Sequence, residues 1–239
     1  MNDTQKQIKL MLETRFEEFT KEKLVVEYVT DVYAKAKEIE KQIDITMRDV
    51  YETSHYTGMF IPAIGSSPFY ILIQEGRNDH LDIMTAFHEW QHAVEYFLLL
   101  NCCFDRDHDQ MIHSKIYPTF QIYSEFSATR KGILHYLNFV EYSNMTKKER
   151  ATCLVNHYRN IYPNFEDITN KYQLIIHTLQ YLGMLFGVKD AVEDFDIDNE
   201  ICLIEYLKDF EKIFDLLHEF AFEYDWFIAF DKAIREFIG

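Results

Sequence analysis

The sequence predicts a mainly helical α+β protein with one small β-sheet in its N-terminal third. Only 7 Gly and 4 Pro occur in 239 residues, which leaves little turn-forming material for a protein built from many strands. Hydrophobic residues make up 48% of the chain, with 20 Phe and 16 Tyr, enough to fill a substantial core and to argue against disorder. Apolar residues recur with helical spacing along most of the chain, and residues 45–75 break that pattern.

The first 43 residues predict two helices, over residues 3–22 and 24–43. The apolar positions at helical spacing are Ile8, Leu12, Phe16 and Phe19 in the first, and Val25, Val29, Val32 and Ala36 in the second. The first twenty residues are charged and amphipathic and lack the apolar segment of a secretion signal. We therefore expect these residues to belong to the folded protein.

Residues 45–75 predict the sheet. The stretch MRDVYETSHYTGMFIPAIGSSPFYILIQE contains three short β-rich runs, separated by turn-forming residues at Thr57-Gly58 and at 65–68. We predict a small three-stranded, largely antiparallel sheet. Pro62 lies in the second run, and because proline cannot donate a ladder hydrogen bond, that strand is expected at an edge or interrupted.

The region after the sheet alternates between helix and loop. The pattern predicts, in order, a loop over 76–79, a helix over 80–100, a loop over 101–118 and a helix over 119–142. The stretch 101–118 is polar and ends in Pro118, which favours a loop, and Thr119 is the expected N-cap of the next helix.

After Asn144 the pattern is helical throughout. The predicted helices cover residues 146–160, 166–187, 198–222 and 225–238. Residues 190–200 form an acidic linker that lacks the glycine and the terminal glutamate of a calcium-binding EF-hand loop, so we interpret it as a solvated loop. The predicted division is a core with N-terminal helices over 1–145 and an acidic all-helical region over 146–239.

Charge excludes one class of partner. The net charge is −16, and residues 151–239 carry 7 basic and 17 acidic side chains, or −10. Direct binding to nucleic acid needs clustered Lys and Arg, so it is disfavoured. The apolar runs, such as YFLLL at 96–100, are far shorter than the roughly 20 residues of a membrane span.

The cysteines predict a reducing compartment. Cys102, Cys103, Cys153 and Cys202 form no C-x-x-C pair, which favours reduced, mostly buried thiols in a cytoplasmic protein. A structural zinc site built on cysteine is correspondingly disfavoured.

The segment TAFHEWQHAVEYF contains the pattern H-E-x-x-H at His88, Glu89 and His92. Residues four apart lie on one face of a helix, so both imidazoles can bind one ion at about 2.0–2.1 Å. Glu89 lies about 100° round the helix, where its carboxylate can reach a metal-activated water without ligating the metal. This spacing predicts a zinc site with Glu89 as general base.

A catalytic zinc ion needs a third protein ligand and one open position. The extension H-E-x-x-H-x-x-G-x-x-H is excluded, because Glu95 and Leu98 occupy its Gly and His positions. Glu125, on the next predicted helix, is the best candidate. Ala128 and Gly132 share its helical face, and their small size would allow that helix to pack closely on the metal helix.

Alternatives to these ligands stay open. His92-x-x-Glu95 could ligate a metal in the manner of a helical bundle, although the second such motif of a di-metal site is missing. His108 and His113 lie in a polar stretch and are expected to face solvent. Tyr123 and His113 are near Glu125 in sequence, but the sequence does not select a residue that would stabilise the oxyanion.

Two motifs carry a resemblance to a known family. The order of N-terminal helices, small sheet, His88-Glu89-Trp90-Gln91-His92 helix and later Glu125-Phe126-Ser127-Ala128 helix resembles the ImmA/IrrE family of gluzincin-type zinc metallopeptidases, over about residues 25–142. The resemblance implies a minimal zincin-like core and zinc bound by His88, His92 and Glu125, with Glu89 as general base. It also implies a bacterial or mobile-element protein whose relatives cleave or regulate repressor-type proteins.

The expected function is zinc-dependent hydrolysis of peptide bonds in one or few protein substrates, such as a basic regulatory protein, with no direct nucleic-acid or membrane partner. The alternative is a non-catalytic, acidic binding protein, resembling DNA in its charge, that engages a basic partner. In that case residues 151–239 would carry the function, and the metal site would be vestigial or structural.

Overall fold

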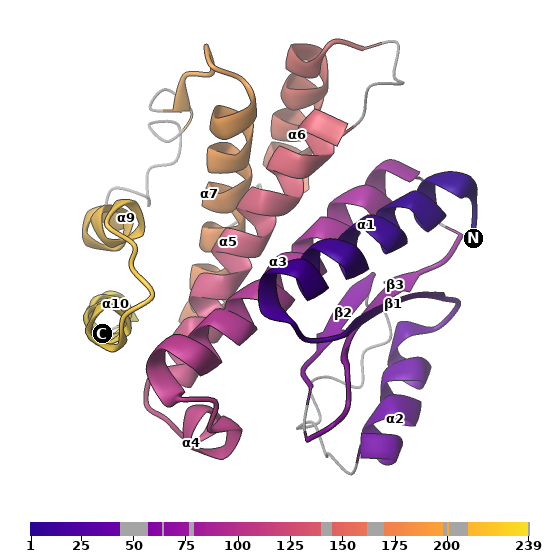
Figure 1. Ribbon diagram of the computed structural model, residues 1–239. Coiled ribbons are helices and arrows are strands. Elements are labelled where there is room, and N and C mark those ends of the chain that lie inside the picture. The colour runs from indigo at the N-terminus through magenta and orange to yellow at the C-terminus, as the bar shows by residue number, and fades with distance from the viewer. Residues whose placement is uncertain are drawn as a thin grey trace. The chain divides into compact units, whose positions relative to one another are not determined.

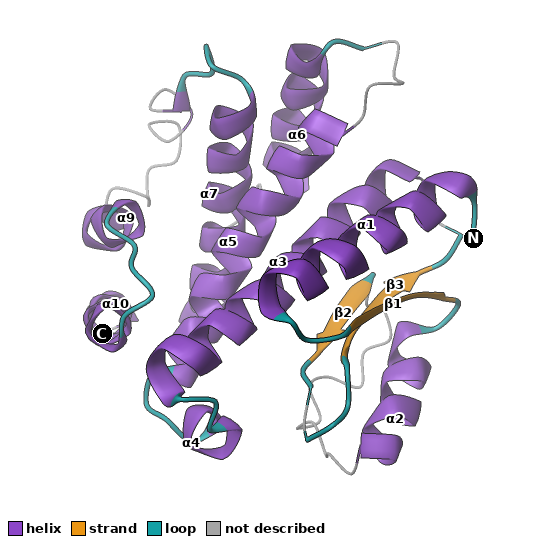
Figure 2. Cartoon of the chain, in the orientation of Figure 1, coloured by secondary structure: helices purple, strands orange, loops and turns teal. Residues whose placement is uncertain are grey.

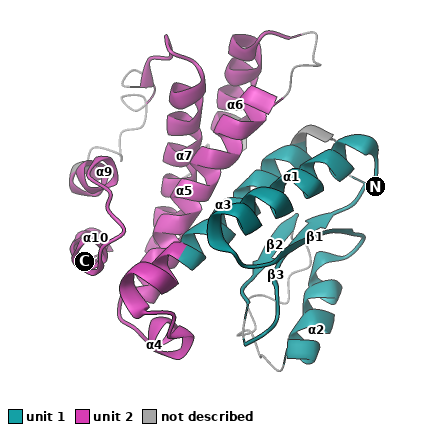
Figure 3. Ribbon diagram, in the orientation of Figure 1, with its two compact units in different colours: residues 1–97 teal, residues 98–239 magenta. Residues whose placement is uncertain are grey.

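The computed structural model describes residues 1–43, 57–63, 65–76, 79–139, 145–161, 170–197, 200 and 210–238. These residues are mostly helical and include one three-stranded sheet, which confirms the predicted fold class (Figure 2). The chain forms two compact units, Met1–Phe97 and Leu98–Gly239 (Figure 3). The predicted division after residue 145, where the acidic helices begin, stays a prediction.

The sheet of the first unit is mixed. Its strands are β1 (Leu24–Val29), β2 (Gly58–Ile61) and β3 (Phe69–Gln74), in the order β1-β3-β2 (Figure 1). β2 pairs with β3 in the predicted antiparallel sense, whereas β1 runs parallel to β3. The prediction of an antiparallel sheet is therefore wrong for one of its two pairings, and the first of the predicted β-rich runs lies outside the described residues.

β1 occupies the start of the stretch predicted as a helix over 24–43. Its sequence LVVEYV is rich in β-branched and aromatic residues, which pack well in strands. Leu24 and Val26 alternate with less buried neighbours, as a half-buried strand requires. The helix begins only at α2 (Val32–Ile43), where the Asp31 carboxylate accepts a hydrogen bond from the backbone N–H of Ala34 at 2.9 Å.

Helices cover both faces of the sheet. On one face, the Phe16 ring of α1 (Asp3–Thr20) lies 5.1 Å from the Phe69 ring of β3, centroid to centroid. Tyr96 of α3 (Asp79–Phe104) lies 6.3 Å from Phe69 on the same face. The opposite face packs on α2, and its buried cluster consists of Val32, Ala36, Ile39, Ile61 and Leu72. The strand period of two thus divides β3 between two apolar layers.

Each edge of the sheet has a feature that limits pairing with a further strand. At the β1 edge, the backbone N–H of Val26 donates to the Glu13 carboxylate at 2.8 Å, and the Lys9 ammonium donates to the Val26 carbonyl. Side chains of α1 therefore occupy hydrogen-bonding groups that an edge strand would otherwise expose. β2 lies at the other edge and ends immediately before Pro62, which confirms the prediction made from that proline.

The second unit is helical in its described residues. Besides the end of α3, its helices are α4 (His108–Ile112), α5 (Tyr117–Phe139), α6 (Lys147–Ile161), α7 (Lys171–Ala191), α9 (Glu211–His218) and α10 (Tyr224–Ile238). This confirms the helical pattern predicted after Asn144. Of the helix predicted over 198–222, residues 201–209 are outside the described part.

The loop predicted over 101–118 is partly wrong. α3 continues to Phe104, and the short helix α4 follows, capped by the Asp107 side chain, which accepts from the Gln110 N–H at 2.9 Å. Pro118 is the second residue of α5, a first-turn position where the missing N–H costs no helical hydrogen bond. Thr119 is therefore inside the helix and not its cap, and its hydroxyl donates to the Asp231 carboxylate at 3.0 Å.

An aromatic cluster forms part of the second unit's core. The buried Tyr123 ring stacks on Phe220, with centroids 4.2 Å apart, and meets Trp226 of α10 edge-on at 5.2 Å. Phe227 and Phe230 are also buried on α10. Burial among these rings gives Tyr123 a packing role.

The acidic linker is engaged in ion pairs. Asp190 pairs with Arg130, Asp194 with Lys148 and Glu200 with Arg159. The hydrogen bond from Lys148 holds the pKa of Asp194 below its usual range. Three carboxylates of the segment interpreted as a solvated loop thus bind basic side chains.

The described cysteines are free, but they are less buried than expected. Cys102 and Cys153 are exposed, Cys103 is half-buried, and Cys202 lies outside the described residues. Of the helices in the described part, none combines the length and the apolar character that crossing a membrane requires.

Candidate metal centre

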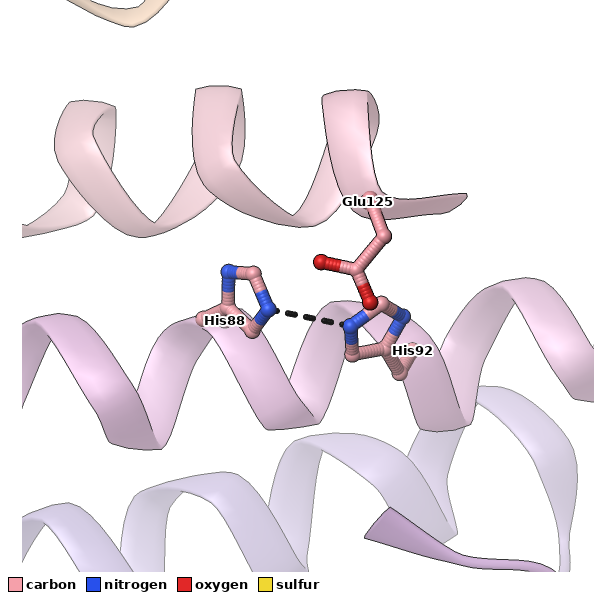
Figure 4. A group of neighbouring side chains, drawn as sticks. All are labelled: His88, His92 and Glu125. Carbon is pink, nitrogen blue, oxygen red and sulfur yellow. Dashed lines mark hydrogen bonds between the residues drawn. The ribbon is translucent and has the colours of Figure 1, made fainter. Parts of the chain in front are cut away.

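The H-E-x-x-H segment lies in the middle of α3, a continuous helix of 26 residues. The spacing of four residues places His88 and His92 on one face, as predicted. Their Nε2 atoms lie 3.0 Å apart, and their rings meet nearly at right angles, with centroids 4.6 Å apart. Figure 4 shows the two Nε2 atoms directed at each other.

Glu125 of α5 joins this pair. Nε2 or Nδ1 of each histidine and one carboxylate oxygen of Glu125 form a group in which all three ligand atoms lie within 4.8 Å of one another. The carboxylate is directed toward the two imidazoles (Figure 4). All three side chains are half-buried. The His88–His92–Glu125 group could therefore hold a metal ion, and the three predicted ligands are brought together.

The donor set and the spacing are compatible with one bound metal ion, and zinc gives the scale of the distances. Two nitrogens bound to one zinc ion at about 2.0–2.1 Å lie about 3.3 Å apart, close to the 3.0 Å between the histidine Nε2 atoms. The ligand atoms of the whole group lie within 4.8 Å of one another. This limit exceeds the roughly 3.3 Å expected between two zinc ligands by about 1.5 Å, a distance that rotation of the carboxylate side chain can cover. Two histidines and one carboxylate also leave one coordination position for a reacting molecule.

Glu89 lies beside this group and is buried, with 9% of its surface exposed. Strand β2 contacts it directly. A Cβ atom on Gly58 would lie 2.9 Å from both Cγ and Oε1 of Glu89, and 2.4 Å from Cγ2 of Thr85. Because these distances are below a normal contact, a residue with a Cβ would displace the two α3 side chains. The sequence marked Gly58 only as a turn residue, whereas its position allows β2 to approach Glu89.

Gln180 is a residue that sequence reasoning missed. Its amide Nε2, on α7, donates a hydrogen bond to Oε2 of Glu125 at 2.9 Å. The two residues are 55 positions apart, so no local spacing could have connected them.

The other candidate residues considered from the sequence, Glu95, His108 and His113, are not members of the His88–His92–Glu125 group. Glu95 is 1% exposed and accepts a hydrogen bond from the Gln91 amide at 2.8 Å, and it is not a member of the three-residue group. His113 is exposed, as expected, and its Nδ1 lies 2.8 Å from the Asp109 carbonyl oxygen. His108 is only partly exposed.

In comparisons with protein-family models, curated proteins and solved structures, no significant match to this chain was found. The assignment of a function therefore depends on the geometry of the site.

Proposed function

We propose that the protein is a zinc-dependent metallopeptidase, with His88, His92 and Glu125 as zinc ligands and Glu89 as general base. The observation that supports this most is the convergence of the three ligand atoms within 4.8 Å, next to a buried carboxylate on the same helix as the two histidines. These are the two parts that hydrolysis by a metal-activated water requires.

Each side chain has a separate task. The imidazoles bind as neutral donors, and Glu125 contributes one negative charge. Zinc supplies Lewis-acid chemistry, which polarises a carbonyl group and acidifies water. Glu89 accepts the proton of the attacking water and returns it to the leaving amine. Its contact with the Gly58 backbone restricts where that carboxylate can lie, and restricted geometry favours efficient proton transfer.

The first test is metal content. We expect about one zinc ion per chain after purification without chelators, measured by elemental mass spectrometry. Less than about 0.2 zinc per chain would contradict the proposal, because a ligand set of this kind binds zinc tightly at neutral pH. That result would favour the acidic binding protein without a catalytic metal.

The second test separates metal binding from proton transfer. Glu89→Gln is expected to keep its zinc and to lose cleavage of a tryptic peptide library and of lysate proteins, read by mass spectrometry of new peptide termini. The loss of a general base costs about 10²–10⁴-fold in rate. Glu95→Gln is the matched control, because it removes the charge of a buried glutamate on the same helix. If Glu89→Gln cleaves as well as the wild type, Glu89 is not the base.

A further inference from the structure

We propose that Gln180 is a positioning residue for the metal site, holding Glu125 in the orientation in which it binds the ion. This rests on the proposed function, in which Glu125 is the third ligand. The inference assigns a role in metal binding to α7, for which the metallopeptidase interpretation of the sequence gave none. Gln180 and Glu125 both lie in the second unit, so their contact is part of the internal packing of that unit.

The first step is the hydrogen bond. The Gln180 amide donates to Oε2 of Glu125 at 2.9 Å, a normal length for an N–H···O bond. A carboxylate has two oxygens and about four lone pairs, so this bond fixes the plane of the group and leaves acceptor sites for a metal ion. An amide carries no charge. The amide therefore orients the carboxylate without competing with a metal cation for it. A Lys or Arg at this position would compete.

The second step is the close approach of α7 to α5. A Cβ on Gly183 would lie 2.4 Å from the carbonyl oxygen of Phe126, the residue after Glu125. A Cβ on Gly187 would lie 2.5 Å from the carbonyl oxygen of Arg130. Gln180, Gly183 and Gly187 are spaced i, i+3 and i+7, which places them on one helical face. The same face that brings the α7 backbone onto α5 therefore presents the Gln180 side chain to Glu125.

The third step is what prevents α7 from sliding along α5. The Arg130 guanidinium binds both carboxylate oxygens of Asp190, with Nε at 2.7 Å and Nη2 at 3.0 Å. It also lies over the Phe186 ring, 5.4 Å from the centroid. A two-pronged ion pair fixes direction as well as distance. This contact and the glycine contacts fix the register that sets Gln180 opposite Glu125.

The test is Gln180→Met, which has similar length and volume but no donor. The zinc dissociation constant, measured by competition with a chelator, is expected to rise 10–100-fold, as is typical when a partner of a metal ligand is lost. Gln173→Met is the matched control, because Gln173 is an exposed glutamine on the same helix, and it is expected to leave the constant unchanged. Visible absorption of the cobalt(II)-loaded protein should change in Gln180→Met and not in Gln173→Met, since cobalt reports the geometry of its ligands.

Equal zinc affinity and equal cobalt spectra for Gln180→Met and the wild type would overturn the inference, and so would an equal loss in both variants. Circular dichroism and thermal unfolding of the metal-free proteins check that each variant folds. If Gln180→Met does not fold, Gln180→Asn takes its place, because it keeps an amide but withdraws it by one carbon, and the same weakening is expected. A wild type that binds no zinc would instead refute the proposed function.

Discussion

The two units use glycine contacts of different kinds. In the first unit, Gly58 of β2 faces atoms of two side chains, Thr85 and Glu89. In the second unit, Gly183 and Gly187 of α7 face backbone carbonyl oxygens of α5. The shortest distances are similar, with a Cβ placed 2.4 Å from Thr85 in the first case and 2.4 Å from the Phe126 carbonyl in the second.

The difference lies in what can move. A side chain can rotate to another rotamer at a modest cost in free energy, whereas a carbonyl in the middle of a helix is fixed by the backbone hydrogen bonds of that helix. The contact at Gly58 therefore limits the positions open to the side chains of Thr85 and Glu89. The contacts at Gly183 and Gly187 set the distance between two helices, and through it the reach of Gln180.

The largest expected effect is the loss of a ligand. His92→Ala in α3 and Glu125→Ala in α5 are each expected to weaken zinc binding by more than about 100-fold, which is the upper end of the effect of losing a mere ligand partner. Isothermal or chelator titration measures both. His113→Ala, at an exposed histidine, is the control. Retained affinity in Glu125→Ala would remove Glu125 from the ligand set.

Gly183→Ala should reduce stability. Overpacking costs about 1–3 kcal/mol, and the clash with a backbone carbonyl places Gly183 at the upper end of that range. Because the better helix propensity of alanine returns up to about 1 kcal/mol, the free energy of unfolding should fall by about 2 kcal/mol. Urea denaturation of the metal-free protein measures it. Gly76→Ala gives a reference without a clash, because its Cβ would enter open space and only the positive φ of +84° opposes it. A stable Gly183→Ala would show that α7 can move away freely.

Gly58→Ala should separate stability from activity. Because side-chain ends can move, its cost in the free energy of unfolding is expected to stay below about 1 kcal/mol. Displacement of Glu89 should nevertheless reduce peptide hydrolysis, with zinc content unchanged. Parallel urea and cleavage measurements test this pair of expectations. A loss of stability as large as that of Gly183→Ala would erase the distinction between the two kinds of contact.

Asp190→Asn is expected to have the smallest effect. It breaks the ion pair with Arg130, whose two side chains are 31% and 28% exposed. Exposed pairs contribute about 0.2–1 kcal/mol, and the two-pronged geometry places this one toward the upper limit. Chemical denaturation at low and high salt measures it. A loss that does not shrink with salt would show that the contribution of Asp190 is not ionic.

What could be predicted from the sequence follows from how local each feature is. His88, Glu89 and His92 lie within one helical turn, so their arrangement follows from helix geometry alone. Glu125 could be proposed because helical periodicity places it on one face with the small residues Ala128 and Gly132. β1 could not, because the apolar positions of residues 24–36 fit a helix as well as a strand, and only pairing with β3 decides between them.

Other features depend on packing between distant segments. The hydrogen bond from Gln180 exists because α7 lies at one register along α5, and that register is set by Gly183, Gly187 and the Arg130–Asp190 pair. The predicted close packing of Gly132 on the metal helix stays a prediction, although Gly132 is buried. The close glycine contacts with the α5 backbone are made by Gly183 and Gly187 of α7.

The parallel pairing of β1 with β3 also imposes an order on folding. Ile61 and Tyr70 of the antiparallel pair are nine positions apart, whereas Leu24 and Phe69 of the parallel pair are 45 apart. Closing the longer loop costs more chain entropy before any contact repays it. We therefore expect the β2–β3 hairpin to form early and β1 to join it in the rate-limiting step. Substitutions in β1 would then slow refolding, which stopped-flow fluorescence can measure.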